Sequence, residues 1–594
     1  MIKERLNKLR KLMEERSIDA YLIPTSDFHE TEYVGEHFKA RHFMSNFSGS
    51  QGTLLVMKDA AYLWVDGRYF IQAAQQLKDT SITQMNIGEE GVLTIEQLLQ
   101  EQLKENDTLG FDGRVLNSQF VKNLLNQIGK NISLYTHEDL VDLIWENRPA
   151  LPQEQGFFYA QAYSGKATRE KLVDIREEMK QKGANTHLIT SLDDIAWILN
   201  IRGKDIAHFP VVLSYLILFE ESGILFVDKK KLTPAMEMNL AVNRIRVKNY
   251  DEVYEEVKTF TSENVVLLNE KVVNYQLVQN INKDVKVIND VNPSQLMKAI
   301  KNEVELENTR LAHIKDGAAV TKFMYWLKNN VGKIEIDEVS AADYLAKCRY
   351  DLGAIDLSFD TIAAYKANAA MMHYSASEDS KATLSANSML LVDSGGHYLE
   401  GTTDITRTFV LGEITQEERL YFTTALKSNI DLSMAHFLYG CRGMNLDILA
   451  RGPLWKLQMD YKCGTGHGIG HLLNVHEGPN GFRWKIVAER NDSCVLEAGM
   501  ICTNEPGVYV EGQFGIRHEN EMIVKNGIKN EYGQFMHFET ITFAPFDLDG
   551  IDVSLLTSEE KNWLNNYHQE VYNKLESYMN DEEKAWLKHV TRAL

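Results

Sequence analysis

The first half of the chain carries the same order of predicted elements twice. An amphipathic helix and the apolar strand AYLIPTSD occupy residues 5–27, and a charged amphipathic helix, a turn and the strand HLITSLDD occupy residues 169–194. In both cases two apolar strands around a charged hairpin follow, LLVMKDAAYLWVD at 54–66 and LILFEESGILFVD at 216–228. A unit that recurs in this way predicts two duplicated α/β domains.

The first predicted domain spans residues 1–150 and ends at the proline-marked linker ENRPALPQE, and the second spans 151–305. Chance is the alternative explanation, because helix–strand units resemble one another. Asp66 and Asp228, which end the two hairpins, are then ordinary turn acids. We assign no chemistry to either.

Composition limits the class of protein and of partner. A chain of 594 residues is too long for one hydrophobic core. The net charge of -21 argues against nucleic acid or an anionic membrane as partner. No run of 18 apolar residues could span a bilayer, and the charged N-terminus lacks an apolar signal core, so we expect a cytoplasmic protein. The five cysteines form no CxxC pair, so we expect reduced thiols.

The second half has a different pattern. A long predicted helix at 301–330 leads into glycine-punctuated strands, and the His, Asp and Glu candidates concentrate between 373 and 519. We expect one domain at 306–540 and a helical C-terminal extension at 541–594. In the extension, Thr557 and Glu560 have capping-box spacing, and the aromatic stripe that follows predicts packing rather than binding.

Three histidines lie in the glycine-rich segment GTGHGIGHLLNVHEGP, residues 464–479. His467 and His471 have the i, i+4 spacing of a helical zinc site. Each of the intervening and flanking glycines, however, costs a helix about 1 kcal/mol relative to alanine. We therefore expect a bent loop or strand in which only one of these two histidines faces the chemistry.

Four acids complete a pattern with this segment. In MLLVDSGGHYLEGTTDITRTFVLG, Asp393 ends an apolar strand and Asp404 opens the next one, so a hairpin could bring both to one face. Glu505 ends the apolar strand of GMICTNEPGVYV, and Glu519 is expected within the next strand, in GIRHENEMIV. Each acid interrupts or follows an apolar run, where an unpaired charge would be costly.

Clustered carboxylates oppose joint ionisation, and two divalent cations would resolve the repulsion. Oxygen donors with one imidazole suit manganese, cobalt, iron or zinc. Such a pair can carry a hydroxide nucleophile and polarise a carbonyl, which predicts hydrolysis. Each acid alone has an ordinary explanation: Asp404 could cap a turn, and Glu519 could pair with Arg517. The joint order Asp, Asp, His, Glu, Glu is much harder to explain in that way.

With these residues in place, the chain resembles the pita-bread metallopeptidases, most closely the long three-domain cytosolic form of aminopeptidase P. The motifs LLVDSGG, GTTDITRTF, GTGHGIG, NVHEGP, NEPG and GIRHEN carry the resemblance, which extends over essentially the whole chain. It implies an α/β and α+β fold, with two creatinase-like N-terminal domains, a pita-bread catalytic domain and the C-terminal extension. It also implies two metal ions, usually manganese with cobalt or zinc as alternatives, held by Asp393, Asp404, His467, Glu505 and Glu519, with Asp404 and Glu519 bridging.

The resemblance also assigns residues around the metals. It places His373 and His476 in the substrate pocket, His476 as a donor to the scissile carbonyl oxygen or to the developing oxyanion. Glu505 would accept the proton of the attacking water, and Arg517 would steady Glu505 and Glu519. His471 stays unassigned, and we expect a loop histidine satisfied by backbone atoms.

Cys463 departs from the family pattern, because a histidine that lines the pocket commonly stands just before GTGHG. A thiol is a much weaker hydrogen-bond partner, so one substrate contact is lost or comes from elsewhere, His471 being one candidate. Metal binding should be unaffected, and we do not expect Cys463 to act as the nucleophile.

The implied reaction removes an N-terminal residue from peptides with a penultimate proline, through a hydroxide that bridges two metal ions. Prolidase, which acts on Xaa-Pro dipeptides, is one alternative, and a non-catalytic pita-bread binding protein is another. Metal-free creatinase shares the fold, but the complete ligand set argues against it. The resemblance also implies a homodimer formed largely through the N-terminal domain.

Overall fold

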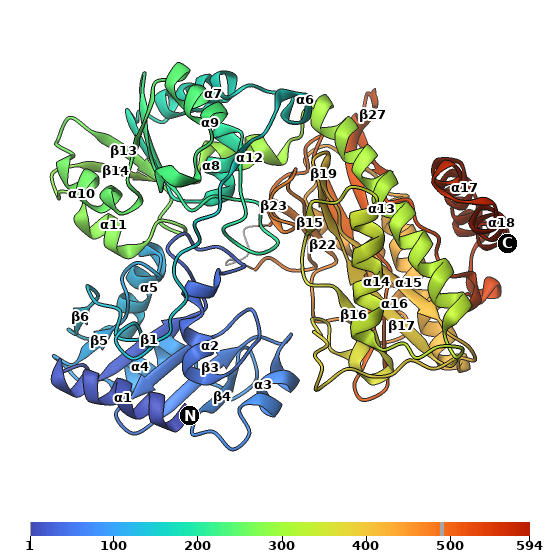
Figure 1. Ribbon diagram of the computed structural model, residues 1–594, viewed down its shortest axis with the longest axis horizontal. Coiled ribbons are helices and arrows are strands. Elements are labelled where there is room, and N and C mark those ends of the chain that lie inside the picture. Colours follow the sequence, from blue (N-terminus) through green and yellow to red (C-terminus); the bar gives the residue numbers. More distant parts are fainter. Residues whose placement is uncertain (1, 488–491) are drawn as a thin grey trace. The chain divides into compact units, whose positions relative to one another are not determined.

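The computed structural model describes residues 2–487 and 492–594, which form two compact units. One unit consists of Met1–Tyr159 and Lys166–Ser294, and the other of Ala160–Gly165 and Gln295–Leu594. Figure 1 shows sheets covered by helices in both units. The domain boundaries at 150, 305 and 540 stay predictions.

The first unit contains the same sheet twice, which confirms the duplicated α/β pattern. Its two six-stranded sheets have the orders β4-β3-β2-β1-β5-β6 and β12-β11-β10-β8-β13-β14, so the strands correspond one to one. The predicted hairpins are the antiparallel pairs β2–β3 and β10–β11. The strands of the first sheet are β1 (Ala20–Pro24), β2 (Thr53–Met57), β3 (Ala61–Val65), β4 (Thr83–Asn86), β5 (Thr108–Gly110) and β6 (Ser133–Tyr135). Those of the second are β8 (Thr186–Ile189), β10 (Tyr215–Phe219), β11 (Gly223–Phe226), β12 (Ile245–Lys248), β13 (Val265–Leu268) and β14 (Lys286–Asn289).

The helices that open the two halves follow the predicted periodicity. Helix α1 (Ile2–Glu15) buries Leu6, Leu9 and Met13 against the first sheet, and α7 (Thr168–Gln181) plays the corresponding part in the second half. Asp66 pairs with Arg68, and Asp228 caps a short 3-10 helix. These are the ordinary turn roles expected of both acids.

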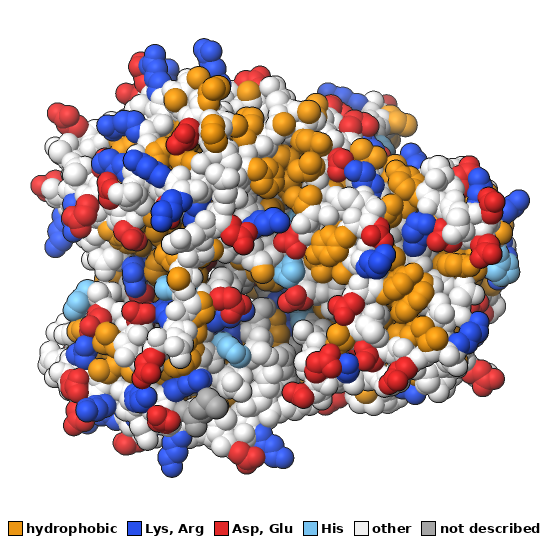
Figure 2. Space-filling model, in the orientation of Figure 1, with side chains coloured by type: hydrophobic (Ala, Val, Ile, Leu, Met, Phe, Trp, Pro, Cys, Tyr) orange, Lys and Arg blue, Asp and Glu red, His pale blue; other side chains and the backbone are white. Residues whose placement is uncertain are grey.

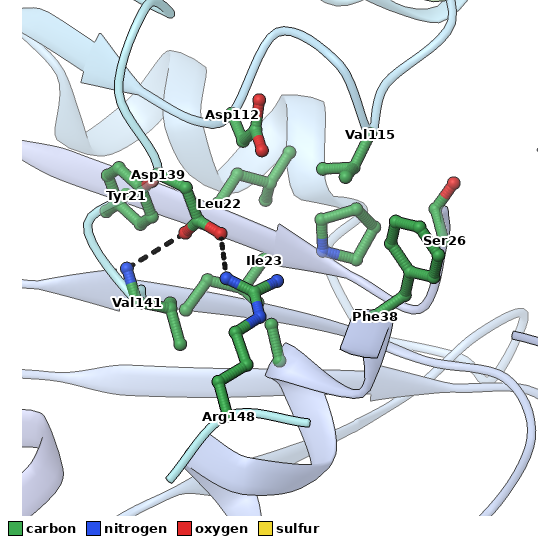
Figure 3. A pocket seen from close by; sticks show the side chains of 12 residues that line it. Tyr21, Leu22, Ile23, Ser26, Phe38, Asp112, Val115, Asp139, Val141 and Arg148 are labelled. Atoms are coloured by element: carbon green, nitrogen blue, oxygen red, sulfur yellow. Dashed lines mark hydrogen bonds and ion pairs between the residues drawn. The ribbon is translucent and has the colours of Figure 1, made fainter. Parts of the chain in front are cut away.

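The pocket drawn in Figure 3 lies in the first half of this unit and holds about 20 Å³. Apolar side chains line it, and the ion pair of Asp139 with Arg148 lies at its edge, with the Oδ2 of Asp139 2.6 Å from Nη1 of Arg148. A cavity of this size has room for about one water molecule.

The second unit packs helices around several sheets, two of which position the candidate site. Helices α13 (Glu303–Asn330), α14 (Glu338–Asp351), α15 (Gln416–Ser433) and α16 (Gly443–Trp455) cover a three-stranded sheet β16-β17-β20 and a six-stranded sheet β21-β28-β27-β24-β22-β23. The strands of the smaller sheet are β16 (Ile362–Tyr365), β17 (Met389–Ser394) and β20 (Ile405–Val410). Those of the larger are β21 (His436–Leu438), β22 (Gly466–Gly468), β23 (Glu477–Phe482), β24 (Ile501–Asn504), β27 (Asn520–Asn530) and β28 (Gly533–Thr540).

The C-terminal extension is helical, as predicted. Helix α17 (Ser558–Leu575) begins with the capping box of Thr557 and Glu560, and α18 (Asp581–Val590) follows it. The apolar side of α17 packs into the core of the second unit through Leu564, Tyr567 and Val571. The aromatic stripe therefore serves packing, as expected.

The cysteines and the charged surface residues can be compared with the sequence-based expectations. Figure 2 shows acidic and basic side chains intermixed over the face in view. All five cysteines are free thiols. Within the described ranges, every helix is too short or too polar to cross a membrane.

Candidate metal centre

The five predicted ligands lie on or directly beside strands of the three-stranded sheet β16-β17-β20 and of the six-stranded sheet. Asp393 lies on β17, and Asp404 directly precedes the antiparallel neighbour β20. His467 is the middle residue of β22, Glu505 directly follows β24, and Glu519 directly precedes β27. Each acid thus stands at or directly beside the end of a strand.

Glu519 departs from its predicted position within a strand. It lies in the two-residue gap between β26 (Phe514–Arg517) and β27. The reason is a change of pairing partner, since β26 pairs with β25 (Gly507–Val510) whereas β27 pairs with β24 and β28.

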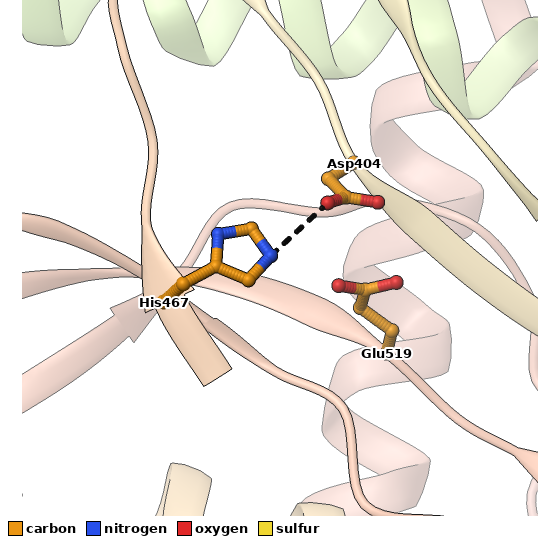
Figure 4. Close-up of side chains that lie close together, drawn as sticks. All are labelled: Asp404, His467 and Glu519. Atoms are coloured by element: carbon orange, nitrogen blue, oxygen red, sulfur yellow. Dashed lines mark ion pairs between the residues drawn. The ribbon is translucent and has the colours of Figure 1, made fainter. Parts of the chain in front are cut away.

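His467 and two acids form a tight group. One ligand atom from each of Asp404, His467 and Glu519 lies within 4.8 Å of the others, and Figure 4 shows the three side chains pointing toward one another. The Nε2 atom of His467 is 3.4 Å from Oδ2 of Asp404 and 3.4 Å from Oε1 of Glu505. Strand β22 needs glycine beside His467 because a Cβ on Gly466 would come within 2.0 Å of the Thr503 carbonyl oxygen.

The tautomer of His467 follows from its other ring nitrogen. Nδ1 lies 3.0 Å from the carbonyl oxygen of Gly468, which can only accept, so Nδ1 carries the proton of the neutral ring. The Nε2 lone pair then faces the carboxylates of Asp404 and Glu505. A lone pair facing two anions is unfavourable unless a cation or a proton lies between them, so this geometry suits a metal ligand.

The charges of neighbouring carboxylates raise the pKa values of Asp404 and Glu519. Burial, and then the charges of Asp393 and Glu505, hold the pKa of Asp404 well above its usual range. The pKa of Glu519 is likewise raised by burial and by Asp404, Glu505 and Asp393. Arg517 opposes the shift of Asp404 but does not cancel it. Asp404 and Glu519 therefore tend to retain protons, which a bound divalent cation would displace.

Within the part of the chain that the structure describes, three carboxylate oxygens of this cluster are buried and have no hydrogen-bond partner. They are Asp393 Oδ1, Asp404 Oδ1 and Glu519 Oε1. Buried polar atoms are nearly always satisfied, so three orphans at one place require an explanation. Oxygen-rich sites with one imidazole are those that hard or borderline divalent cations occupy. The residues present therefore fit such a cation.

Arg517 hydrogen-bonds Asp393, an acid that was not among its expected partners, and it also interacts electrostatically with Glu505. Its Nη2 donates to Oδ2 of Asp393 at 2.5 Å and its Nη1 to the hydroxyl of Tyr509 at 2.6 Å. Its Nε donates to the Thr406 hydroxyl at 3.2 Å, which in turn donates to Oε2 of Glu519 at 2.7 Å. Arg517 thus reaches Glu519 only through Thr406, because Asp393 and Thr406 are register partners on β17 and β20.

Several supporting residues were not predicted from the sequence. Thr406 and Tyr509 lie inside the quoted motifs, so their proximity to Asp404 and Glu505 was the available signal. Glu521 accepts the backbone N–H of Asp404 at 2.6 Å and lies 2.9 Å from Nε2 of His313 on α13. No local pattern could have connected His313 with this site, because 208 positions separate it from Glu521 in the sequence.

The other three candidate histidines have different surroundings. His471 is buried and hydrogen-bonded to the carbonyl oxygen of Tyr163 at 3.0 Å and to the Thr309 hydroxyl at 3.1 Å, so it is a satisfied loop residue and does not replace the missing pocket histidine. The ring of His476 lies edge-on to that of His467, with centroids 4.3 Å apart. His373 lies between Met371 and Tyr374, which pack with Tyr509.

Cys463 lies near Glu505. Burial, and then the charge of Glu505, raises the pKa of its thiol to about 11. It is therefore a thiol rather than a thiolate at neutral pH, which agrees with the expectation that it is no nucleophile.

Known protein families match most of the chain. Residues 307–526 match the model of metallopeptidase family M24, and 534–594 match the C-terminal region of these peptidases. Residues 5–144 and 147–305 both match the creatinase/prolidase N-terminal domain. The chain belongs to metallopeptidase family M24.

Individual relatives extend over the full length. A probable Xaa-Pro aminopeptidase P of Talaromyces marneffei is 38% identical over 100% of this chain and 92% of its own. One from Laccaria bicolor is 37% identical over 98% and 92%. The crystal structure of X-prolyl aminopeptidase from Caenorhabditis elegans, described as a cytosolic enzyme with a di-nuclear active site, covers both chains completely with 33% identity and a TM-score of 0.94.

Proposed function

We propose that this chain is a metal-dependent aminopeptidase that cleaves the bond between an N-terminal residue and a penultimate proline. Asp393, Asp404, His467, Glu505 and Glu519 would hold two divalent ions. The observation that carries the proposal is the buried acid cluster, in which three oxygens lack a partner among the described residues. The full-length similarity to Xaa-Pro aminopeptidases supports the substrate class.

The exposure of the ligands indicates the side from which substrate approaches. The side chains of His467 and Glu505 are 18% and 20% exposed, whereas that of Asp404 is only 6% exposed. Bound ions would polarise the scissile carbonyl and lower the pKa of a water molecule. Glu505 is the acid on the open side, so its carboxylate is placed to take the proton that this water loses and to pass it to the leaving proline nitrogen.

The neighbouring side chains supply orientation. His476, beside His467, is placed to donate a hydrogen bond to the oxygen that gains charge as the carbonyl is attacked. An Xaa-Pro bond has no N–H to grip, so recognition depends on ring shape and on the carbonyl. His373, with its neighbours Met371 and Tyr374, suits that task. Cys463 would line the same pocket with an uncharged, weakly polar side chain.

The finer properties are proposals as well. We propose manganese as the metal, with cobalt or zinc as the alternatives, because the donor set is mostly carboxylate oxygen. A cytoplasmic location is supported by the description of the Caenorhabditis elegans protein as cytosolic. We propose a homodimer on the basis of the family resemblance, and light scattering of the purified chain would test it.

The test combines metal analysis with substrate length. Chelator-treated chain should lose turnover of Xaa-Pro-Xaa peptides and regain it when two equivalents of Mn²⁺ are added. Preference for an Xaa-Pro dipeptide over the tripeptide would instead identify a prolidase. Two bound ions without any turnover would favour a binding protein, and absence of metal uptake in the wild type would refute the metal centre.

A further inference from the structure

The C-terminal extension contains a tyrosine that hydrogen-bonds Arg407, a side chain on the strand that follows Asp404. Tyr567 lies on α17, which is dark red in Figure 1, and is 6% exposed. Its hydroxyl accepts a hydrogen bond from Nη2 of Arg407 at 2.9 Å. The same hydroxyl lies 2.9 Å from the carbonyl oxygens of Thr542 and Ala544, to either of which it can donate its own proton.

Arg407 transmits this contact to the ligands. It follows Thr406 on β20, is 1% exposed, and its Nη1 donates to the backbone carbonyl of Glu519 and, at 2.9 Å, to that of Thr406. Its Nη2 also donates to Oδ1 of Asn520 at 2.8 Å. The guanidinium thus ties β20, which follows Asp404, to the gap between β26 and β27 that carries Glu519.

Every acceptor of this guanidinium within the described ranges is a neutral oxygen. Besides those named, they are the carbonyl oxygens of Pro545 and Ala544. One face of the guanidinium lies 4.0 Å from the ring centre of Phe546. A planar guanidinium that is held by hydrogen bonds on several sides and by an aromatic ring on one face has one orientation.

We infer that the C-terminal extension supports the metal centre. Its Tyr567 is a positioning residue that acts on Glu519 through Arg407. The hydroxyl fixes the guanidinium, the guanidinium fixes the Glu519 carbonyl, and the Thr406 hydroxyl holds the Glu519 carboxylate from the same strand. This inference rests on the proposed metal-binding function of Glu519. It gives the C-terminal extension, residues 541–594, a role in metal affinity in addition to packing.

The experiment removes one oxygen atom. Tyr567→Phe in the full-length chain should weaken Mn²⁺ affinity, measured by calorimetric titration of chelator-treated protein, by about 10-fold, the lower end of the effect of residues that support metal ligands. The manganese concentration that gives half-maximal turnover should shift by the same factor. Tyr572→Phe is the matched control, since its hydroxyl on the same helix bonds Glu576 instead, and it should leave the affinity unchanged.

The readouts separate positioning from simple stability. If Tyr567→Phe keeps the wild-type affinity for Mn²⁺, the inference is wrong, whether or not the variant lowers the midpoint of thermal unfolding of the metal-free chain. Arg407→Lys keeps the charge and loses the fork, so it should weaken the affinity at least as much as Tyr567→Phe, and wild-type affinity in that variant would also overturn the inference. A wild-type chain that takes up no Mn²⁺ would instead overturn the proposed function.

Discussion

Replacing Asp404 by asparagine should make the metal-free protein more stable while it destroys the metal site. Asp404 is 5% exposed, and its ligand oxygen lies within 4.8 Å of one on Glu519. Two unit charges at that distance repel by about 3 kcal/mol at an effective dielectric constant of about 20. Asparagine has nearly the same shape and no charge, so the substitution relieves this repulsion without opening a cavity.

The sign depends on pH. Because the pKa of Asp404 is raised in the folded chain, ionisation costs more there than in the unfolded chain. The wild type is therefore destabilised progressively as pH rises from the carboxyl's ordinary value toward the raised one. The amide side chain of the Asp404→Asn variant cannot ionise, so this variant should gain up to about 3 kcal/mol over the wild type at pH 9, and less as the pH is lowered.

The assay is thermal unfolding of chelator-treated protein at pH 6 and pH 9, repeated with excess Mn²⁺. The wild type should be stabilised by the metal and Asp404→Asn should not, so the order of stability reverses. Glu511→Gln, which removes a charge from an exposed turn, is the control and should behave as wild type in both conditions. A metal-free Asp404→Asn variant that unfolds below wild type at pH 9 would refute the electrostatic argument.

Four further outcomes follow from the site. Because the pKa values of Asp404 and Glu519 are raised, metal uptake should release protons and tighten as pH rises; calorimetric heats that do not depend on the ionisation enthalpy of the buffer would contradict this. Thr406→Val removes the donor to Glu519 and should weaken Mn²⁺ affinity about 10-fold in the same titration. His476→Ala should lower kcat by roughly 100-fold or more with metal content unchanged, and loss of metal would show that it is a ligand instead. Cys463, with its pKa raised to about 11, should react slowly with iodoacetamide at pH 7.5, and Cys463→Ser should keep turnover within several-fold.

The repeat shows how far local pattern alone extends. Alternating apolar residues and a shared order of helix, strand and hairpin predicted the two halves of the first unit. The two sheets indeed have the same strand order. Periodicity identifies which residues face a core, but it does not say which strands pair, and the central places of β1 and β8 beside β5 and β13 come from tertiary pairing.

The candidate metal ligands could be chosen from the sequence for a related reason. An acid that ends or interrupts an apolar strand must have a partner, and four such acids with one histidine leave few alternatives. Their supports were not predictable. Arg517 was expected to steady Glu505 and Glu519. Its hydrogen bond to Asp393, 124 positions away, could not be predicted, because only tertiary packing decides which carboxylate lies beside the guanidinium.

The sequence by itself determined the kinds of element, the identity of the five candidate ligands and the class of chemistry, because each of these is encoded in residue type and short-range spacing. Only the tertiary structure decided how the ligands are held. The bonds from Asp404 to Glu521 and from Arg407 to Tyr567 span 117 and 160 residues. Contacts of that range form only when separate strands and helices pack together, so no local pattern can specify them.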